Sequence, residues 1–277
     1  MIKNISIDLL VPFENHPFKK RSGIEQQELT ESIKENGLLE PIIVRSFPAG
    51  KYEIISGHRR VEACKELGIT EVPAIIEELT KDEAIVQMVD SNIHREHILP
   101  SEKAFAYKMK SEALKHQGKA SCQLGTKIRT DEKIAETADD SARQIQRYIR
   151  LTYLIPELLK LVDEERIAFT PAVELSYLSE YEQRTLLDQI EFTDATPSLS
   201  QAQRLRKFSK DGNFFVGTVF AVLNEEKPNQ KEQVRISADK LRDILPRGMD
   251  KQKTEDFIIK ACDHYRKYLI RQRERDG

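Results

Sequence analysis

The chain has 277 residues, of which 39% are apolar and 32% are charged, and its formal net charge is −2. This length predicts two or three domains. No apolar run approaches the roughly 18 residues of a membrane-spanning helix, and the first residues lack the apolar core of a signal peptide. Cys64, Cys122 and Cys262 lie far apart without a Cys-x-x-Cys pair. This spacing argues against a zinc site or a disulfide framework and for a reducing cytoplasm.

Positive and negative charges are sorted along the chain. Residues 101–130 carry seven Lys or Arg against two Asp or Glu, whereas residues 153–199 carry three against ten. A nearly neutral total can therefore hide a basic surface for nucleic acid. The alternative is that helical segments show such blocks by chance.

The first hundred residues alternate between strand and helix patterns. Strands are predicted over residues 5–11, 38–45, 52–55 and 72–76. Helices are predicted over residues 26–36, 58–67 and 81–92, with glycine stops and a capping box at Thr80–Glu83. These elements predict one small α/β unit.

A glycine turn connects the third of these strands to the second helix. Ser56 and Gly57 follow the strand, and Arg59 and Arg60 open the helix. Such a turn gathers backbone N–H groups and the positive end of the helix dipole at one point. Two arginines there are suited to a bidentate grip on phosphate oxygens. The pattern indicates an anion site, and the alternative is a helix start with two solvated arginines.

The segment over residues 90–96 ends this unit and is polar. Oxygen ligands from Asp90, Asn92 and Glu96 would suit Mg²⁺ held jointly with a phosphate. The alternative is an ordinary helix C-terminus with a solvated tail. A lysine-rich helix is then predicted from Pro100 to about His116, and a polar loop over residues 118–125.

Residues 131–152 have the pattern of a helix-turn-helix. A capping box at Thr130–Lys133 opens a short helix, and Ala138–Asp140 forms a tight turn in which Asp139 can adopt a left-handed conformation. Ser141 then caps a second helix over residues 142–152. The apolar face of this helix carries Ile145, Tyr148 and Ile149, and another face carries Arg143, Arg147 and Arg150.

The second helix is predicted to enter the major groove of DNA. Arg143, Gln144 and Arg147 would reach base edges or phosphates. The alternative is a helical hairpin in a bundle with a solvated arginine face.

The rest of the chain is predicted to be mostly helical. Acidic helices run from residue 156 to 203, a short basic helix covers 200–210, and Gly212 marks a boundary. Strand-like segments follow over 214–223 and 233–237, and helices over 238–245 and 254–273. The last helix has an apolar stripe that would either close a small domain or pair with a second copy.

Three features now stand in fixed order: Gly57-His58-Arg59-Arg60, then Asn92-Ile93-His94-Arg95-Glu96, then the helix-turn-helix. Together they resemble the ParB family of DNA-partition proteins, in the variant found in plasmids and mobile elements of Gram-positive bacteria. Residues 38–45 are similar to the family's first conserved box. The resemblance covers roughly residues 1–210, and the ordered set is more specific than any single motif.

The resemblance implies an α+β protein of three domains. Residues 1–99 would have the ParB/sulfiredoxin fold, bind CTP with Mg²⁺ and self-associate into a clamp around DNA. Residues 100–210 would be an all-α DNA-binding domain. Residues 211–277 lie beyond the resemblance, and their own pattern predicts a small, mostly helical domain that could serve dimerisation. A homodimer would recognise a palindromic centromere-like site in double-stranded DNA, with a Walker-type partition ATPase as partner. The protein would be cytoplasmic and associated with the nucleoid.

The resemblance also implies which residues form the sites, by their positions in the matching motifs. Ser56, Gly57, Arg59, Arg60 and Arg95 would hold the phosphates of CTP, and Asn92 would help to place the metal. The DNA-binding residues would be Ser141, Arg143, Gln144, Arg147 and Arg150.

The chain also departs from the family pattern. His58 stands where the family usually has Glu. Ser91 stands where the family usually has a Glu that is tied to metal binding and CTP turnover, so CTP binding with weak hydrolysis at most is expected. The C-terminal part does not match the usual dimerisation domain, and no arginine-bearing N-terminal motif for stimulating the ATPase is evident.

Two other readings remain open. One is a transcriptional or replication regulator of a mobile element, with DNA binding but no nucleotide switch. The other is an enzyme of the same fold. Sulfiredoxin needs a cysteine in the turn at Gly57-His58, which has none. A nuclease needs clustered carboxylates for two metals, and near Gly57 only Glu53 and Glu62 occur.

Overall fold

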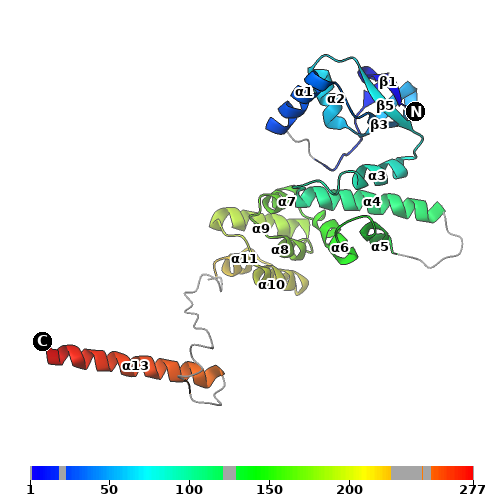
Figure 1. Ribbon diagram of the computed structural model, residues 1–277. Helices are drawn as coiled ribbons and strands as arrows, with labels where there is room; N and C mark the ends of the chain where they lie inside the picture. Colours follow the sequence, from blue (N-terminus) through cyan, green and yellow to red (C-terminus); the bar gives the residue numbers. More distant parts are fainter. Residues whose placement is uncertain (1, 19–22, 121–128, 226–244, 246–250, 277) are drawn as a thin grey trace. The chain divides into compact units, whose positions relative to one another are not determined.

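The structure, a computed structural model, describes residues 2–18, 23–120, 129–225, 245 and 251–276. The chain divides into two compact units, residues 1–225 and 226–277, which Figure 1 traces from blue to red. Among the helices of the described ranges, none has the length and apolar character needed to cross a membrane.

A five-stranded mixed sheet organises the N-terminal part of the first unit, in the order β1-β5-β3-β4-β2. The pairs β1–β5 and β3–β4 are antiparallel, and the pairs β3–β5 and β2–β4 are parallel. The strands are β1 (Ile2–Ser6), β2 (Leu10–Val11), β3 (Ile42–Phe47), β4 (Lys51–Ser56) and β5 (Glu71–Glu77).

The predicted strand over residues 5–11 is wrong as a single element, because the 3-10 helix Ile7–Leu9 divides it into β1 and β2. The strand predicted from Leu38 begins only at Ile42.

Helices α1 (Ile24–Asn36) and α2 (His58–Glu66) pack on the sheet through a shared apolar core. Ile33, Val44 and Val61 are buried in it. Helix α3 (Lys81–Asp90) contacts β4 and then α4. Thr80 and Glu83 form the predicted capping box at its start. The predicted α+β class is confirmed, with a small sheet followed by many helices (Figure 1).

The remainder of the first unit is helical, with a core of buried aliphatic side chains. Its helices are α4 (Pro100–Ala120), α5 (Thr130–Ala135), α6 (Ala142–Leu151), α7 (Pro156–Asp163), α8 (Phe169–Leu175), α9 (Glu180–Thr193), α10 (Leu199–Lys210) and α11 (Val216–Leu223). Helix α4 runs beyond the predicted end at His116, so the first residues of the predicted loop over 118–125 are helical and residues 121–128 lie outside the described ranges.

The strand predicted over residues 214–223 is wrong, because this segment forms α11. Its β-branched residues suggested a strand, yet Val219, Val222 and Leu223 have helical spacing and are fully buried against the core of α9 and α10. The compact unit consequently extends to Glu225, past the predicted boundary at residue 210. The predicted strand over 233–237 lies outside the described residues, as does the helix over 238–245 apart from Leu245.

The second unit contains the helix α13 (Lys251–Asp276), which includes the helix predicted over residues 254–273. Tyr265, Tyr268 and Leu269 on α13 are exposed, with relative accessibilities of 61%, 49% and 42%.

A third core connects the sheet part to the helical part of the first unit. Phe13, Ile55 and Met88 from the N-terminal side pack in one buried cluster with Tyr107 of α4 and Ile145 of α6. The predicted boundary at residue 99 therefore runs through a continuous apolar core.

Candidate functional site

The turn between β4 and α2 requires glycine for two reasons. Gly57 has a φ of 103°, in the left-handed region. A Cβ at this position would lie 2.7 Å from Cγ2 of Ile42. The predicted strand, turn and helix are confirmed. The first N–H groups of any such helix have no acceptor within the helix itself.

A cavity of about 520 Å³ opens at this turn. All six residues predicted to bind the nucleotide and metal line it, namely Ser56, Gly57, Arg59, Arg60, Asn92 and Arg95. Its other walls are largely apolar or aromatic, with Pro12, Phe13, His16, Phe18, Leu29, Ile55 and His58. Sequence reasoning missed the wall from residues 12–18, since its prolines indicated only a loop.

Both arginines of the turn are held in place by neighbouring segments. Arg59 donates from Nε to Oε1 of Gln26 at 3.0 Å and from Nη2 to the carbonyl of Glu25 at 2.8 Å. Arg60 donates from Nη1 to the carbonyls of Glu40 and Pro41, at 2.6 and 3.1 Å. A guanidinium has five N–H donors, so each arginine is oriented and keeps donors for an anion.

Asn92 presents an unpaired polar atom at the cavity. Its side chain is buried, and Nδ2 donates to the carbonyl of Met88 at 2.6 Å and to Oγ of Ser91 at 3.1 Å. Oδ1 is also buried and has no hydrogen-bond partner among the described residues. Because an unpaired buried acceptor is costly, this oxygen fits a cation or a donor of a bound ligand.

Asp90 does not join Asn92 as a ligand. Its carboxylate pairs with the buried Lys110 of α4 and accepts from Oγ1 of Thr137 at 3.3 Å. Neither Asp90 nor Glu96 lines the cavity. Within the described ranges no three His, Cys, Asp or Glu side chains gather around a metal position. Of the three oxygen ligands suggested by the sequence, the structure therefore brings only Asn92 to the cavity.

Two histidine rings pack on each other in the cavity wall. The ring centroids of His16 and His58 lie 4.6 Å apart with the rings edge to face. Nδ1 of His16 donates to the carbonyl of Phe18 at 3.1 Å, and Nε2 of His58 accepts from the N–H of Phe13 at 3.3 Å. Burial, followed by the charge of Arg95, lowers the pKa of His16 below its ordinary value of 6.5.

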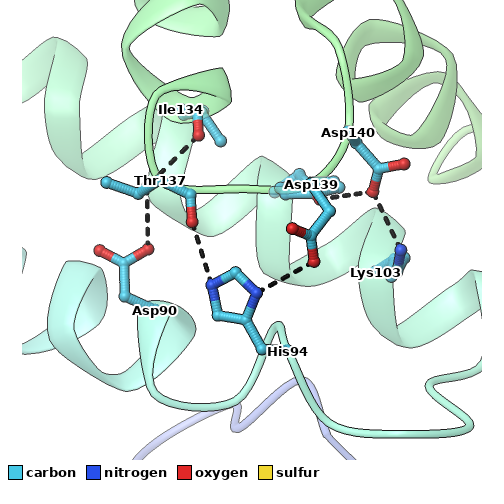
Figure 2. Close-up of polar contacts among 8 residues, drawn as sticks. Asp90, His94, Lys103, Ile134, Thr137, Asp139 and Asp140 are labelled. Carbon is cyan, nitrogen blue, oxygen red and sulfur yellow. Dashed lines mark hydrogen bonds and ion pairs between the residues drawn. The ribbon is translucent and has the colours of Figure 1, made fainter.

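The helix-turn-helix is joined to the segment that carries Asn92 and Arg95 (Figure 2). His94 contacts the carboxylate of Asp139 through Nδ1 and the carbonyl of Thr137 through Nε2, both at 3.1 Å. Asp139 does not use the left-handed conformation that its residue type would tolerate, because its φ is negative.

Helix α4 holds the same turn from its other side. Asp140 accepts from Nζ of Lys103 at 2.9 Å and from the hydroxyl of Tyr107 at 2.6 Å. Burial and this carboxylate raise the pKa of Tyr107 far above its ordinary range. The turn is thus fixed both to α4 and to the segment that borders the cavity.

The caps of the two helices differ in detail from the prediction. Arg129, not Thr130, is the N-cap of α5, and its N–H donates to Glu132 at 3.2 Å. Ser141 caps α6 as predicted, because its Oγ accepts from the N–H of Gln144 at 3.3 Å.

The three arginines of α6 lie in different environments. Arg143 is exposed. Arg147 donates to Thr170 of α8 at 2.8 Å and to Gln144 at 3.0 Å. Arg150 donates from Nη2 to the carbonyl of Ser176 at 2.7 Å and from Nε to its hydroxyl at 3.1 Å. The predicted basic face is therefore partly used to fasten α6 to α8.

The profile of the ParB N-terminal domain matches residues 1–93. A probable chromosome-partitioning protein ParB of Campylobacter jejuni is 31% identical over 260 residues, which cover 92% of this chain and 82% of that protein. Another, of Coxiella burnetii, is 30% identical over 183 residues, or 66% of this chain. The chain spans only 58% of the Coxiella protein and 60% of a similar protein from Vibrio cholerae.

Among solved structures, a C-terminally truncated ParB from Caulobacter crescentus complexed to the centromeric parS site is 23% identical, with a TM-score of 0.47, and the match covers 74% of this chain and 98% of that one. A sulfiredoxin from Arabidopsis thaliana is 28% identical over 30% of this chain and 90% of its own, with a TM-score of 0.27. By its identity to the Campylobacter protein over most of both sequences, this chain belongs to the ParB family of chromosome-partitioning proteins.

Proposed function

We propose that the protein binds a palindromic site in double-stranded DNA as a homodimer and serves DNA segregation, in the cytoplasm with the nucleoid. CTP with Mg²⁺ would occupy the cavity at Gly57 and act as a switch. The observation that carries the nucleotide part of this proposal is that six residues from two segments about 35 positions apart line one cavity. Family membership supports the DNA-binding role, and a partition ATPase would be the partner.

The cavity is chemically suited to a nucleotide with a metal ion. The oriented donors of Arg59 and Arg60 and the N-terminus of α2 would bind phosphate oxygens. Oδ1 of Asn92 would face the ion, whose charge would assist in holding the phosphates. The apolar and aromatic side would take the nucleoside.

Binding without appreciable turnover fits the segment around Asn92. Ser91 donates its hydroxyl to the carbonyl of Met88 at 3.0 Å and does not line the cavity. Among the described residues, no carboxylate lines the cavity to activate a water molecule. A two-metal nuclease would need carboxylates to bind its metal ions, so the lining of this cavity does not favour that function.

Calorimetric titration with CTP, ATP and GTP in the presence of Mg²⁺ tests the proposal. Selective binding of CTP is expected. Arg59→Ala should abolish it, whereas Glu62→Ala on the same helix should not, since Glu62 lies outside the cavity lining. A thermal melting experiment on Arg59→Ala shows whether the variant has lost stability, because Arg59 also contacts α1. If the unaltered protein bound no nucleotide, either alone or with a DNA site, the switch would be ruled out and a DNA-binding regulator would take its place.

A further inference from the structure

We infer that Phe169 and Thr170, at the start of α8, are positioning residues that orient the guanidinium of Arg147 for reading a base pair. This inference rests on the proposed DNA-reading role of α6. It adds to the reading surface a segment that lies about twenty residues beyond the helix-turn-helix.

The contacts around Arg147 hold its guanidinium group on three sides. Nη2 donates to Oγ1 of Thr170 at 2.8 Å, and Nη1 donates to Oε1 of Gln144 at 3.0 Å. The guanidinium carbon lies 4.9 Å from the ring centroid of Phe169, within the range of a cation–π interaction. The ring of Phe169 is in turn held against Tyr148, with centroids 4.7 Å apart.

These contacts leave the reading capacity of Arg147 intact. Of its five N–H donors, two are used, so each terminal nitrogen keeps one and Nε keeps its own. Paired donors of this kind match the O6 and N7 acceptors of guanine in the major groove. Because the side chain is already ordered, less rotamer freedom is lost when DNA binds.

The other two arginines of α6 are less suited to reading a base than Arg147 is. The guanidinium carbon of Arg150 lies 4.4 Å from the ring centroid of Tyr153 and 4.0 Å from that of Tyr177, and Arg150 is hydrogen-bonded to Ser176. Its side chain therefore serves to hold α6 against α8. Arg143 is exposed, and the described residues supply it with no hydrogen bond or ion pair, which suits a phosphate contact that adapts to the backbone.

The test starts with a duplex selected by the full-length protein from a random pool. Affinity is then measured for that duplex, for each single base-pair change and for unrelated DNA. Arg147→Ala should lose about 5- to 150-fold of discrimination at one guanine position. Phe169→Leu and Thr170→Val should each lose about 2- to 10-fold at that same position, with binding to unrelated DNA unchanged.

Double variants separate positioning from a general structural effect. If Phe169 and Thr170 act through Arg147, their substitutions should cause no further loss when Arg147→Ala is present. Thr193→Val is the matched control, because it removes a hydroxyl that donates at 2.7 Å within α9, away from α6. That control should keep full discrimination. If Phe169→Leu impairs folding in a melting experiment, Thr170→Val carries the test.

The outcomes also separate this inference from the proposed function. Full discrimination in Arg147→Ala would refute base reading by Arg147 itself. Loss in Arg147→Ala together with unchanged discrimination in both α8 variants would overturn the positioning role alone. Additive losses in the double variants would do the same, because they would show that α8 acts independently of Arg147.

Discussion

At the scale of single residues, His16 makes a testable contribution to pH dependence. Burial lowers its pKa in the folded protein below 6.5, and the charge of Arg95 acts in the same direction. The unfolded chain therefore binds this proton at a higher pH than the folded protein does. The stabilising contribution of neutral His16 is complete above pH 6.5 and is lost as the pH falls from that value through the lower pKa of the folded protein.

Urea unfolding at pH 7.5 and pH 5.0 should show this effect in the difference between two proteins. We expect the unaltered protein to lose more free energy of unfolding between these conditions than His16→Gln, which has no proton to bind. All other titrating groups are common to both. Equal losses would mean that His16 titrates in the folded protein as it does in the unfolded chain.

Individual residues also show how far the sequence could be interpreted. The ordered motifs identified the six residues that line the cavity. The family resemblance made this possible, because spacing in the sequence does not show that the two segments carrying these residues lie together. Asp90 was misassigned, since its partner Lys110 lies twenty residues away on a helix that was predicted only as lysine-rich. The role of Arg150 was missed for the same reason: Ser176 and Tyr177 meet it only after α8 has packed on α6.

At the scale of elements, the connection between β4 and α2 depends on Gly57. Gly57→Ala would introduce both left-handed strain and an overlap with Ile42 at 2.7 Å. Gly68→Ala is the matched control, because its φ is 71° and no atom lies within 4 Å of the added Cβ. Urea unfolding should show a loss of about 1–2 kcal/mol for the control, from strain alone. Gly57→Ala should lose about 1–3 kcal/mol more, and equal losses would contradict the overlap.

Elements were predicted best where local chemistry decides them. The capping box at Thr80, the cap at Ser141 and the left-handed turn at Gly57 can each be predicted from neighbouring residues, and all three are confirmed. The segment over residues 214–223 failed because its local preference for a strand is overridden by burial of one helical face against α9 and α10.

At the scale of the whole molecule, the proposed homodimer predicts a role for the C-terminal unit. Exposed aromatic and aliphatic side chains along α13 would pair with a second copy. Sedimentation at micromolar concentration should show a dimer for the full chain and a monomer for a chain ending at Glu225, which retains the three apolar cores. Affinity for a palindromic duplex should fall with the loss of the dimer. A dimeric shortened chain would place the contact in the first unit instead.

The apolar core shared by Phe13, Ile55, Met88, Tyr107 and Ile145 has a consequence for inheritance. Recombination that exchanged residues 1–93, the part matched by the domain profile, would pair the sheet part of one lineage with the helical part of another. Side chains shaped for different neighbours would then meet at that core. Viable chimeras should therefore carry α4 and the helix-turn-helix together with the sheet, and the two halves should diverge in step.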